Sequence, residues 1–409
     1  MKLVRSILTG SSRQLWTVLG IVFCTLVLTA IGIAFVESTT MGWIRPFALK
    51  QTLFAVLGLL VVVIVCTVDY RQLERWAFLI YGGLLLLLLA LLVAGRVGID
   101  RWILAEKSLQ PSELMKVVLV LALAHYLRFR KDQRSLVGLM RPVLLTLVPM
   151  VLVLGQPDLG TSLMLPPILL AMLFVSGARR AHLVLALILG ALLLPGALLV
   201  HMYHDYIPFS EKIIKPYQVK RIESFLKRDD QLKDGYQLNQ SIIAFGSGGV
   251  TGKGWAKGPQ NRLGFVPAKH TDFIFAIIGE EWGFVGACGV LLLYFMLVFL
   301  CVQVAVQTRE PFGRLVAAGI ATLLAVQGLQ NVGMTLGLTP ITGLPLPFVS
   351  YGGSSLLTSF LAIALVLNIG MRRVIVMASQ DLNPHDDRTI VPIIDDRAAG
   401  ATMWPDGHY

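Results

Sequence analysis

Asp272 is the acidic residue whose surroundings best suit chemistry. It lies in the stretch HTDFIFAIIGEE, which runs from His270 to Glu281, and six apolar residues follow it directly. At a junction between water and an apolar interior, burial raises the pKa of a carboxyl group, which suits a general base. The alternative role is that of a helix N-cap, in which the carboxylate accepts hydrogen bonds from the first free amides of the following helix. The two roles are compatible, and the spacing does not choose between them.

A second polar group consists of Arg101-Trp102 and the stretch QPSELMK at residues 110–116. Pro, Ser and Glu at the start of this stretch favour the first turn of a helix. Arg101 and Lys116 are cations that suit the binding of a pyrophosphate. The local alternative for Lys116 is an ion pair with Glu113, three residues earlier on the same helix.

Two further stretches lie beside apolar runs. In QPDLGT, at residues 156–161, Asp158 has the chemistry to hydrogen-bond a sugar, to coordinate a cation, or to pair with Lys116 or Arg101. Pairing is the commonest fate of an acid inside a membrane. Residues 331–355 combine many Gly and Pro residues with no obvious acid or base. Irregular backbone is tolerated at membrane depth only where it is buried in protein or lines a water-filled cavity, so we expect this stretch to form a cavity wall.

The composition requires a membrane scaffold for these groups. The chain has 409 residues, of which 56% are hydrophobic and 14% charged, and its mean hydropathy is +0.73. Apolar runs of about 20 residues recur along it, and they are continuous, which excludes a β-barrel. We therefore predict an all-α, polytopic membrane protein with about ten transmembrane helices. The expected spans are residues 15–36, 51–68, 77–95, 113–128, 142–155, 159–177, 182–203, 273–304, 314–338 and 350–370.

The basic residues of the short loops lie mainly on the side that carries both termini, so both termini are predicted to be cytoplasmic. Residues 1–373 are expected to form a single membrane domain, followed by a cytoplasmic, disordered tail at 374–409. The basic loop at 204–270 is the exception and is predicted to be extracytoplasmic, because loops longer than about 60 residues translocate regardless of charge. This loop is expected either to lie on anionic headgroups or to hold a phosphate-bearing substrate.

The net charge of +11 is compatible with a nucleic-acid partner, but its distribution over membrane loops argues against one. The four cysteines all fall inside apolar spans, which predicts neither a disulfide framework nor a metal site. Together, the polar groups describe one extracytoplasmic cavity with carboxylates and cations. Such a cavity suits an anionic, amphipathic molecule from the outer leaflet.

The order of the polar motifs resembles that of the SEDS proteins, the RodA/FtsW/SpoVE family. The blocks QPSELMK, QPDLGTSL, GKGW, FVPAKHTDFIFAIIGEE and NVGMTLGLTPITGLPLPFVSYGGSS follow one another as they do in that family, and the match spans residues 15–373. Three stretches look more like RodA than FtsW, namely HTDFIFA, KDGYQLNQS and LVLNIGMRR.

The resemblance implies a ten-span peptidoglycan glycosyltransferase of the bacterial cytoplasmic (inner) membrane. Such an enzyme polymerises lipid II into glycan strands for cell-wall elongation and rod shape, and releases undecaprenyl pyrophosphate. The implied partners are a class B penicillin-binding protein, which is the transpeptidase, and other proteins of the elongation or division complex. No tightly bound cofactor is expected, although a divalent cation (Mg²⁺ or Mn²⁺) is compatible with the chemistry. The family's essential aspartate falls on Asp272, the predicted general base.

Substrate contacts are expected from the matching motifs and from basic residues near them, namely Arg101, Trp102, Gln110, Ser112, Glu113, Lys116, Asp158, Lys253, Arg262, His270, Thr271 and Glu281. The sequence leaves two other functions open. A lipid II flippase would use the intramembrane Asp and Lys residues to move its substrate across the bilayer, but the sequence has no inverted repeat and no cytoplasmic polar relay. A non-catalytic scaffold for the penicillin-binding protein would tolerate changes at Asp272.

Overall fold

The computed structural model describes residues 12–41, 47–95, 110–129, 135–188 and 233–381, together with residues 190, 221 and 225. Within these residues the regular structure is helical throughout, which confirms the predicted all-α fold. The helices are α2 (Ser12–Thr40), α3 (Phe47–Thr67), α4 (Tyr70–Gly95), α5 (Pro111–Leu127), α6 (Leu136–Gly155), α7 (Leu159–Val175), α11 (Lys233–Ser247), α12 (Pro259–Arg262), α13 (Ile274–Gln307), α14 (Pro311–Thr335) and α15 (Gly353–Asp381).

The helices agree with the predicted spans as far as the structure describes them. Seven of them, α2, α3, α4, α6, α13, α14 and α15, are long and apolar enough to cross a membrane. The helices α5 and α7, of 17 residues each, occupy the fourth and sixth predicted spans. The seventh span, predicted at 182–203, is described only in part, with helix at 180–188, so the count of ten stays a prediction.

Two predicted boundaries fall at the edge of the described chain. Helix α15 continues to Asp381, beyond the predicted end of the membrane domain at residue 373. Residues 382–409 of the predicted tail lie outside the described residues, as does most of the predicted extracytoplasmic loop before residue 233. The division into a membrane domain and a tail therefore stays a prediction.

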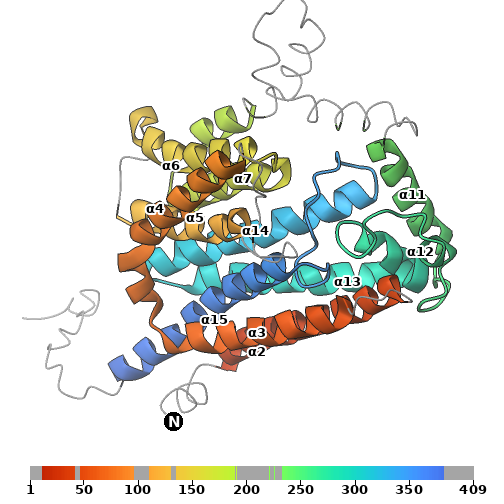
Figure 1. The fold of residues 1–409 in the computed structure, drawn as a ribbon. Helices are drawn as coiled ribbons and strands as arrows, with labels where there is room; N and C mark the ends of the chain where they lie inside the picture. Colours follow the sequence, from red (N-terminus) through yellow and green to blue (C-terminus); the bar gives the residue numbers. More distant parts are fainter. Residues whose placement is uncertain are drawn as a thin grey trace, which may run out of the picture.

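Burial separates the centre of the bundle from its rim. The helix α5 is buried along almost its whole length, and 72% and 83% of the apolar windows of α14 and α15 are buried. In α3 and α4 the buried share is 17%. The helices α2 and α3 pack against α13 and α15, while α4 and α7 pack around α5 (Figure 1). The central helices are thus shielded, and the rim helices are the ones that meet lipid.

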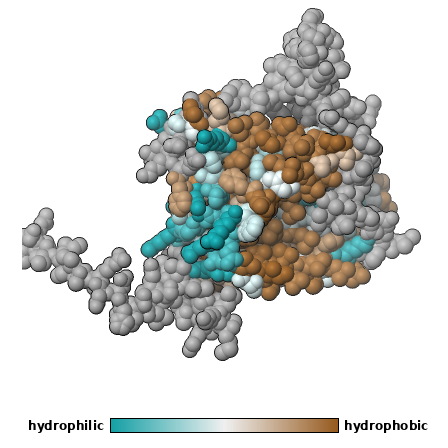
Figure 2. All heavy atoms as spheres, turned by 60° about the vertical axis from the view of Figure 1, so that its left-hand side comes forward, coloured by the Kyte–Doolittle hydropathy of each residue, from teal (hydrophilic) through white to brown (hydrophobic). Residues whose placement is uncertain are grey.

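The rim exposes the apolar side chains that a lipid environment requires. Leu60 and Val63 of α3 are 54% and 61% exposed, for example. In the view of Figure 2, apolar side chains cover most of the described surface, and hydrophilic side chains gather on one side of it. Since lipid tails are apolar, this surface needs no further cover.

A glycine-rich loop, residues 248–254, packs its backbone against a break in α13. The break lies at Gly283, whose φ of 67° and ψ of −168° interrupt the helix. On one side of the break the amide of Lys253 donates to the carbonyl oxygen of Glu280 at 3.1 Å. On the other side the amide of Phe284 donates to the loop at the carbonyl of Gly249, at 2.9 Å. The loop therefore satisfies the backbone groups that the break leaves open.

The glycines of this loop permit a close approach of two backbones. A Cβ atom on Gly248 would lie 2.0 Å from the carbonyl oxygen of Gly279, and one on Gly252 would lie 2.2 Å from the carbonyl oxygen of Glu281. Only glycine fits at such distances. The contact fixes the first segment of α13, residues 274–282, and Asp272 lies just before that segment.

The close approach predicts opposite effects for two neighbouring glycines. Gly248→Ala should destabilise the protein, because overpacking of a fixed contact costs about 1–3 kcal/mol. Gly246→Ala is the matched control, because a Cβ atom there meets nothing within 4 Å and alanine favours the helix α11. In detergent, the melting temperature should fall for the first variant and stay or rise for the second. Equal melting temperatures would contradict the contact.

Candidate active site

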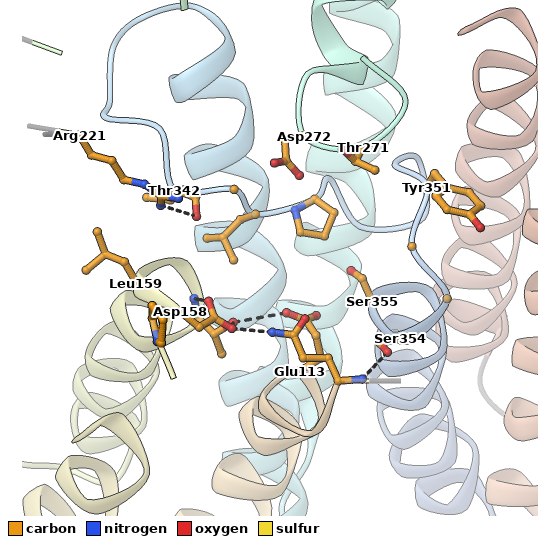
Figure 3. A pocket seen from close by; sticks show the side chains of 18 residues that line it. Glu113, Asp158, Leu159, Arg221, Thr271, Asp272, Thr342, Tyr351, Ser354 and Ser355 are labelled. Atoms are coloured by element: carbon orange, nitrogen blue, oxygen red, sulfur yellow. Dashed lines mark hydrogen bonds between the residues drawn. The ribbon is translucent and has the colours of Figure 1, made fainter. Parts of the chain in front are cut away.

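A polar cavity of about 320 Å³ opens where four helices begin. The N-terminal ends of α5, α7, α13 and α15 surround it, and the irregular segment 342–345, which follows α14, crosses it. In Figure 3, Asp272 and Thr271 lie on one side of the cavity, and Asp158 and Glu113 lie on the other. Since the positive end of a helix dipole lies at its N-terminus, four such ends favour an anionic ligand.

Asp272 lies in the turn that leads into α13. The backbone amides of Thr271 and Phe273 both donate to the carbonyl oxygen of Ala268, at 3.1 and 3.3 Å. The N-cap residue of α13 is Phe273, and no side chain caps the helix. Asp272 is therefore not the cap of α13, and the Asp272 side chain lines the cavity instead (Figure 3).

The surroundings of Asp272 raise the pKa of its carboxyl group from 3.8 to about 6. Burial is the largest cause, because the charged form loses its hydration. The guanidinium of Arg221, which also lines the cavity, and a hydrogen bond with Thr271 hold this pKa down, since both favour the ionised form. Such a pKa leaves the carboxylate ionised at neutral pH and still basic enough to accept a proton.

Asp158, the second carboxylate of the cavity, is saturated with hydrogen bonds. It caps α7 by accepting from the amide of Thr161 at 3.1 Å. Its other oxygen, Oδ2, accepts from Gln110 Nε2 at 2.7 Å and from the hydroxyls of Ser112 and Thr161 at 3.0 Å each. It makes no ion pair with Lys116. Asp158 therefore joins the starts of α5 and α7 and forms one wall of the cavity.

The local ion pair predicted in α5 is present. Lys116 Nζ lies 2.9 Å from both carboxylate oxygens of Glu113 and donates to Gln327 Oε1 at 3.1 Å. Lys116 is 1% exposed and does not line the cavity, whereas Glu113 does. The ammonium group is thus occupied inside the protein and does not reach the cavity lining.

The structure brings Gln110, Glu113, Asp158, Thr271 and Asp272 together around the cavity. Other predicted substrate contacts lie outside its lining, namely Ser112, Lys116, Lys253, Arg262, His270 and Glu281. Arg101 and Trp102 lie outside the described residues. A substrate contact for these residues stays a prediction.

Glu281 and its neighbour Glu280, which was not a predicted site residue, are both buried, with exposed fractions of 1% and 0%. Glu281 accepts from Ser38 Oγ at 2.6 Å and from Asn261 Nδ2 at 2.7 Å. Glu280 accepts from Lys253 Nζ at 3.3 Å. The Glu281 contacts join α2 and α12 to α13, and the Glu280 contact joins the glycine-rich loop to α13. The ring of His270 lies beside Phe47 and Tyr351. The backbone carbonyl oxygen of His270 accepts a hydrogen bond from the amide of Tyr351 at 2.9 Å.

The sequence did not single out Arg221 as a cavity residue. Its guanidinium donates to the carbonyl oxygen of Thr342 at 3.3 Å. The residue belongs to a loop with many basic side chains, and no local pattern distinguishes it from them. The segment 342–345, in contrast, confirms the cavity wall predicted from its glycine and proline content.

Comparisons with known proteins agree on one family. The family model of FtsW, RodA and SpoVE, described as "Cell cycle protein", matches residues 11–374. The chain is 34% identical over 415 residues to "Peptidoglycan glycosyltransferase RodA" of Treponema pallidum, covering 85% of this chain and 96% of that protein. It is 37% identical over 331 residues to "Probable peptidoglycan glycosyltransferase FtsW" of Trichlorobacter lovleyi, covering 79% and 83%.

A solved structure has the same fold. It is described as "Structural coordination of polymerization and crosslinking by a peptidoglycan synthase complex". The alignment has a TM-score of 0.73 and 33% sequence identity, and it covers 87% of this chain and 97% of that chain.

The burial of Asp272 predicts that its ionisation lowers the stability of the fold as the pH rises. A carboxyl group whose pKa rises on folding contributes stability that is complete below its unfolded pKa of 3.8 and is lost as the pH rises through about 6. Asp272→Asn avoids this loss, so it should stabilise the protein by up to about 3 kcal/mol at pH 8 and by much less at pH 4. Melting temperatures of both proteins at the two pH values test this. An equal difference at both values would contradict the raised pKa.

Proposed function

Because the chain belongs to the FtsW/RodA/SpoVE family of cell cycle proteins, we propose that the cavity around Asp272 is the site where it polymerises lipid II into glycan strands. The chain is a peptidoglycan glycosyltransferase, the activity that the names of its relatives give. One observation carries the choice of site. A carboxylate with a raised pKa and no capping role lines a polar cavity that the N-termini of four helices surround.

In the proposed reaction, Asp272 acts as the general base. It accepts the proton of the acceptor sugar hydroxyl, whose oxygen attacks the anomeric carbon of the growing, lipid-linked strand. The new glycosidic bond forms as the bond from that carbon to the pyrophosphate breaks, and undecaprenyl pyrophosphate leaves with the bonding electrons. A pKa near 6 suits this step, since the base is ionised at neutral pH before it accepts the proton.

The leaving pyrophosphate needs positive charge, and the cavity supplies it from two sources. Arg221 lines the cavity near Asp272, and its guanidinium is a planar donor that suits phosphate oxygens. The N-termini of α5, α7, α13 and α15 add the positive ends of their dipoles. We propose Arg221 for the role that the sequence assigns to Lys116, because Lys116 is bound to Glu113 and Gln327.

The residues of the cavity do not fit a resident metal ion. Asp158 already accepts four hydrogen bonds. In the described part of the chain, no three His, Cys, Asp or Glu side chains come together to hold a metal. We propose that the enzyme has no tightly bound cofactor, and that any Mg²⁺ or Mn²⁺ it uses is bound through the pyrophosphate of the substrate.

The proposed partner is a class B penicillin-binding protein. The related solved structure is a peptidoglycan synthase complex that coordinates polymerisation with crosslinking, which supports such a transpeptidase partner. Relatives named RodA and FtsW match this chain comparably, and the RodA-like motifs favour a role in elongation. We propose a location in the bacterial cytoplasmic membrane with both termini in the cytoplasm, supported by the basic residues of the short loops.

The base assignment predicts a specific loss of activity. Asp272→Asn keeps the shape of the side chain and removes its basicity, so polymerisation should fall by at least about 100-fold. Asp69→Asn is the matched control, because Asp69 pairs with Arg372 and does not line the cavity. The assay is gel electrophoresis of glycan strands made from lipid II by the purified protein with its transpeptidase partner. Long strands made by the Asp272→Asn variant would rule out the base assignment.

The role of Arg221 predicts weaker binding of the pyrophosphate. Arg221→Gln should raise the KM for lipid II about 10- to 100-fold, the usual worth of a hydrogen bond to a charged group. Arg221→Lys should recover part of this loss, because it restores the charge without the planar donor. Arg180→Gln, an exposed residue away from the cavity, serves as the control. An unchanged kcat/KM for Arg221→Gln would contradict the role.

A further inference from the structure

Helix α14 carries two buried side-chain amides one turn apart, and both face the cavity wall. Asn331 and Gln327 are 0% and 3% exposed. Asn331 Nδ2 donates to the backbone carbonyl of Asp272 at 2.9 Å and to that of Leu344 at 2.7 Å. Gln327 Nε2 donates to the carbonyl of Pro345 at 2.9 Å. The two amides therefore hold the segment 342–345 by consecutive carbonyl groups, and Asn331 also holds the turn that carries Asp272.

The orientation of the Asn331 amide follows from its neighbours. Both groups within reach of its nitrogen are carbonyl oxygens, which only accept hydrogen bonds, so the NH₂ group must face them. Its own oxygen, Oδ1, is buried and has no partner among the described residues. Leaving a buried polar atom without a partner is costly. A leucine of similar size would avoid this cost, so packing alone does not account for an asparagine here.

The two carbonyl groups that Asn331 joins flank the carboxylate of Asp272. One belongs to Asp272 itself. The other belongs to Leu344, which follows Gly343, and a Cβ atom on Gly343 would lie 3.4 Å from Asp272 Oδ2. A shift of either backbone would therefore move the carboxylate relative to the wall beside it.

We infer that Asn331 is a positioning residue for the general base, which fixes Asp272 against the segment 342–345 through two hydrogen bonds and does not touch the substrate. The inference rests on the proposed role of Asp272. It requires that Asn331 act on the chemical step and leave substrate binding unchanged, because its side chain does not line the cavity. A misplacement of about 1 Å in a reacting group costs about 100-fold in rate.

Gln330, the neighbouring residue on α14, offers a matched control. Its Nε2 donates to Thr339 Oγ1 and to the carbonyl of Pro340, both at 3.3 Å. It thus holds residues 339 and 340, just before the segment 342–345, by a side-chain amide, at a point that neither lines the cavity nor contacts Asp272. Loss of this amide tests the effect of loosening the irregular chain between α14 and α15 at another point.

The experiment measures initial rates of lipid II polymerisation by the full chain with its transpeptidase partner, over a range of lipid II concentrations. Asn331→Leu should lower kcat about 100-fold and leave KM within about twofold, whereas Gln330→Leu should leave both within about twofold. Asn331→Asp, which keeps the shape and offers one O–H donor when protonated, should lie between the wild type and Asn331→Leu. Melting temperatures identify a variant that fails to fold. If Asn331→Leu does not fold, the kcat of Asn331→Asp decides the outcome.

Two results would overturn the inference. One is a kcat within about twofold of the wild type for a folded Asn331→Leu or Asn331→Asp variant. The other is a raised KM with an unchanged kcat, which would assign Asn331 to substrate binding. Asp272→Asn, measured in parallel, separates this inference from the base assignment. If Asp272→Asn stays active, the base assignment fails; if it is inactive while Asn331→Leu is active, only the positioning role fails.

Discussion

The desolvation of one carboxylate is the constraint on which the rest of the site depends. Asp272 is half-buried in the wall of the cavity, just before the apolar start of α13, and this burial raises the pKa of its carboxyl group to about 6. Burial by itself favours the neutral form of the group. The attraction of Arg221 and the hydrogen bond with Thr271 keep it ionised near neutral pH. The site thus combines a basic carboxylate with a cation that suits an anionic leaving group.

The two aspartates of the cavity show how environment separates a reactive acid from a structural one. Asp158 accepts four hydrogen bonds and fixes the starts of α5 and α7. Asp272 is fixed through its backbone, by the turn at Ala268 and by Asn331, so its carboxylate need not anchor the chain. The glycine-rich loop fills the break in α13 at Gly283 and holds residues 274–282, the helical segment that follows Asp272.

Much of this could be predicted from local sequence, because continuous apolar runs identify membrane helices and an acid just before such a run identifies Asp272. The ion pair of Glu113 and Lys116 follows from helical spacing. The rest depends on contacts between distant segments. Asn331 meets Asp272 across 59 positions, and Lys116 meets Gln327 across 211. Arg221 is one of many basic residues in its loop, so only the fold singles it out. The helix N-cap falls on Phe273, one residue later than the alternative role for Asp272 required.

The pH dependence of kcat/KM for lipid II polymerisation tests the central claim most directly. A general base acts only when ionised, so the rate constant should rise tenfold per pH unit at low pH and level off above a midpoint near 6. A midpoint near 4 would mean that Asp272 is solvated like an ordinary carboxylate. A profile that stays flat from about pH 5 to pH 8 would mean that no group with this pKa takes the proton, and either result would contradict the account.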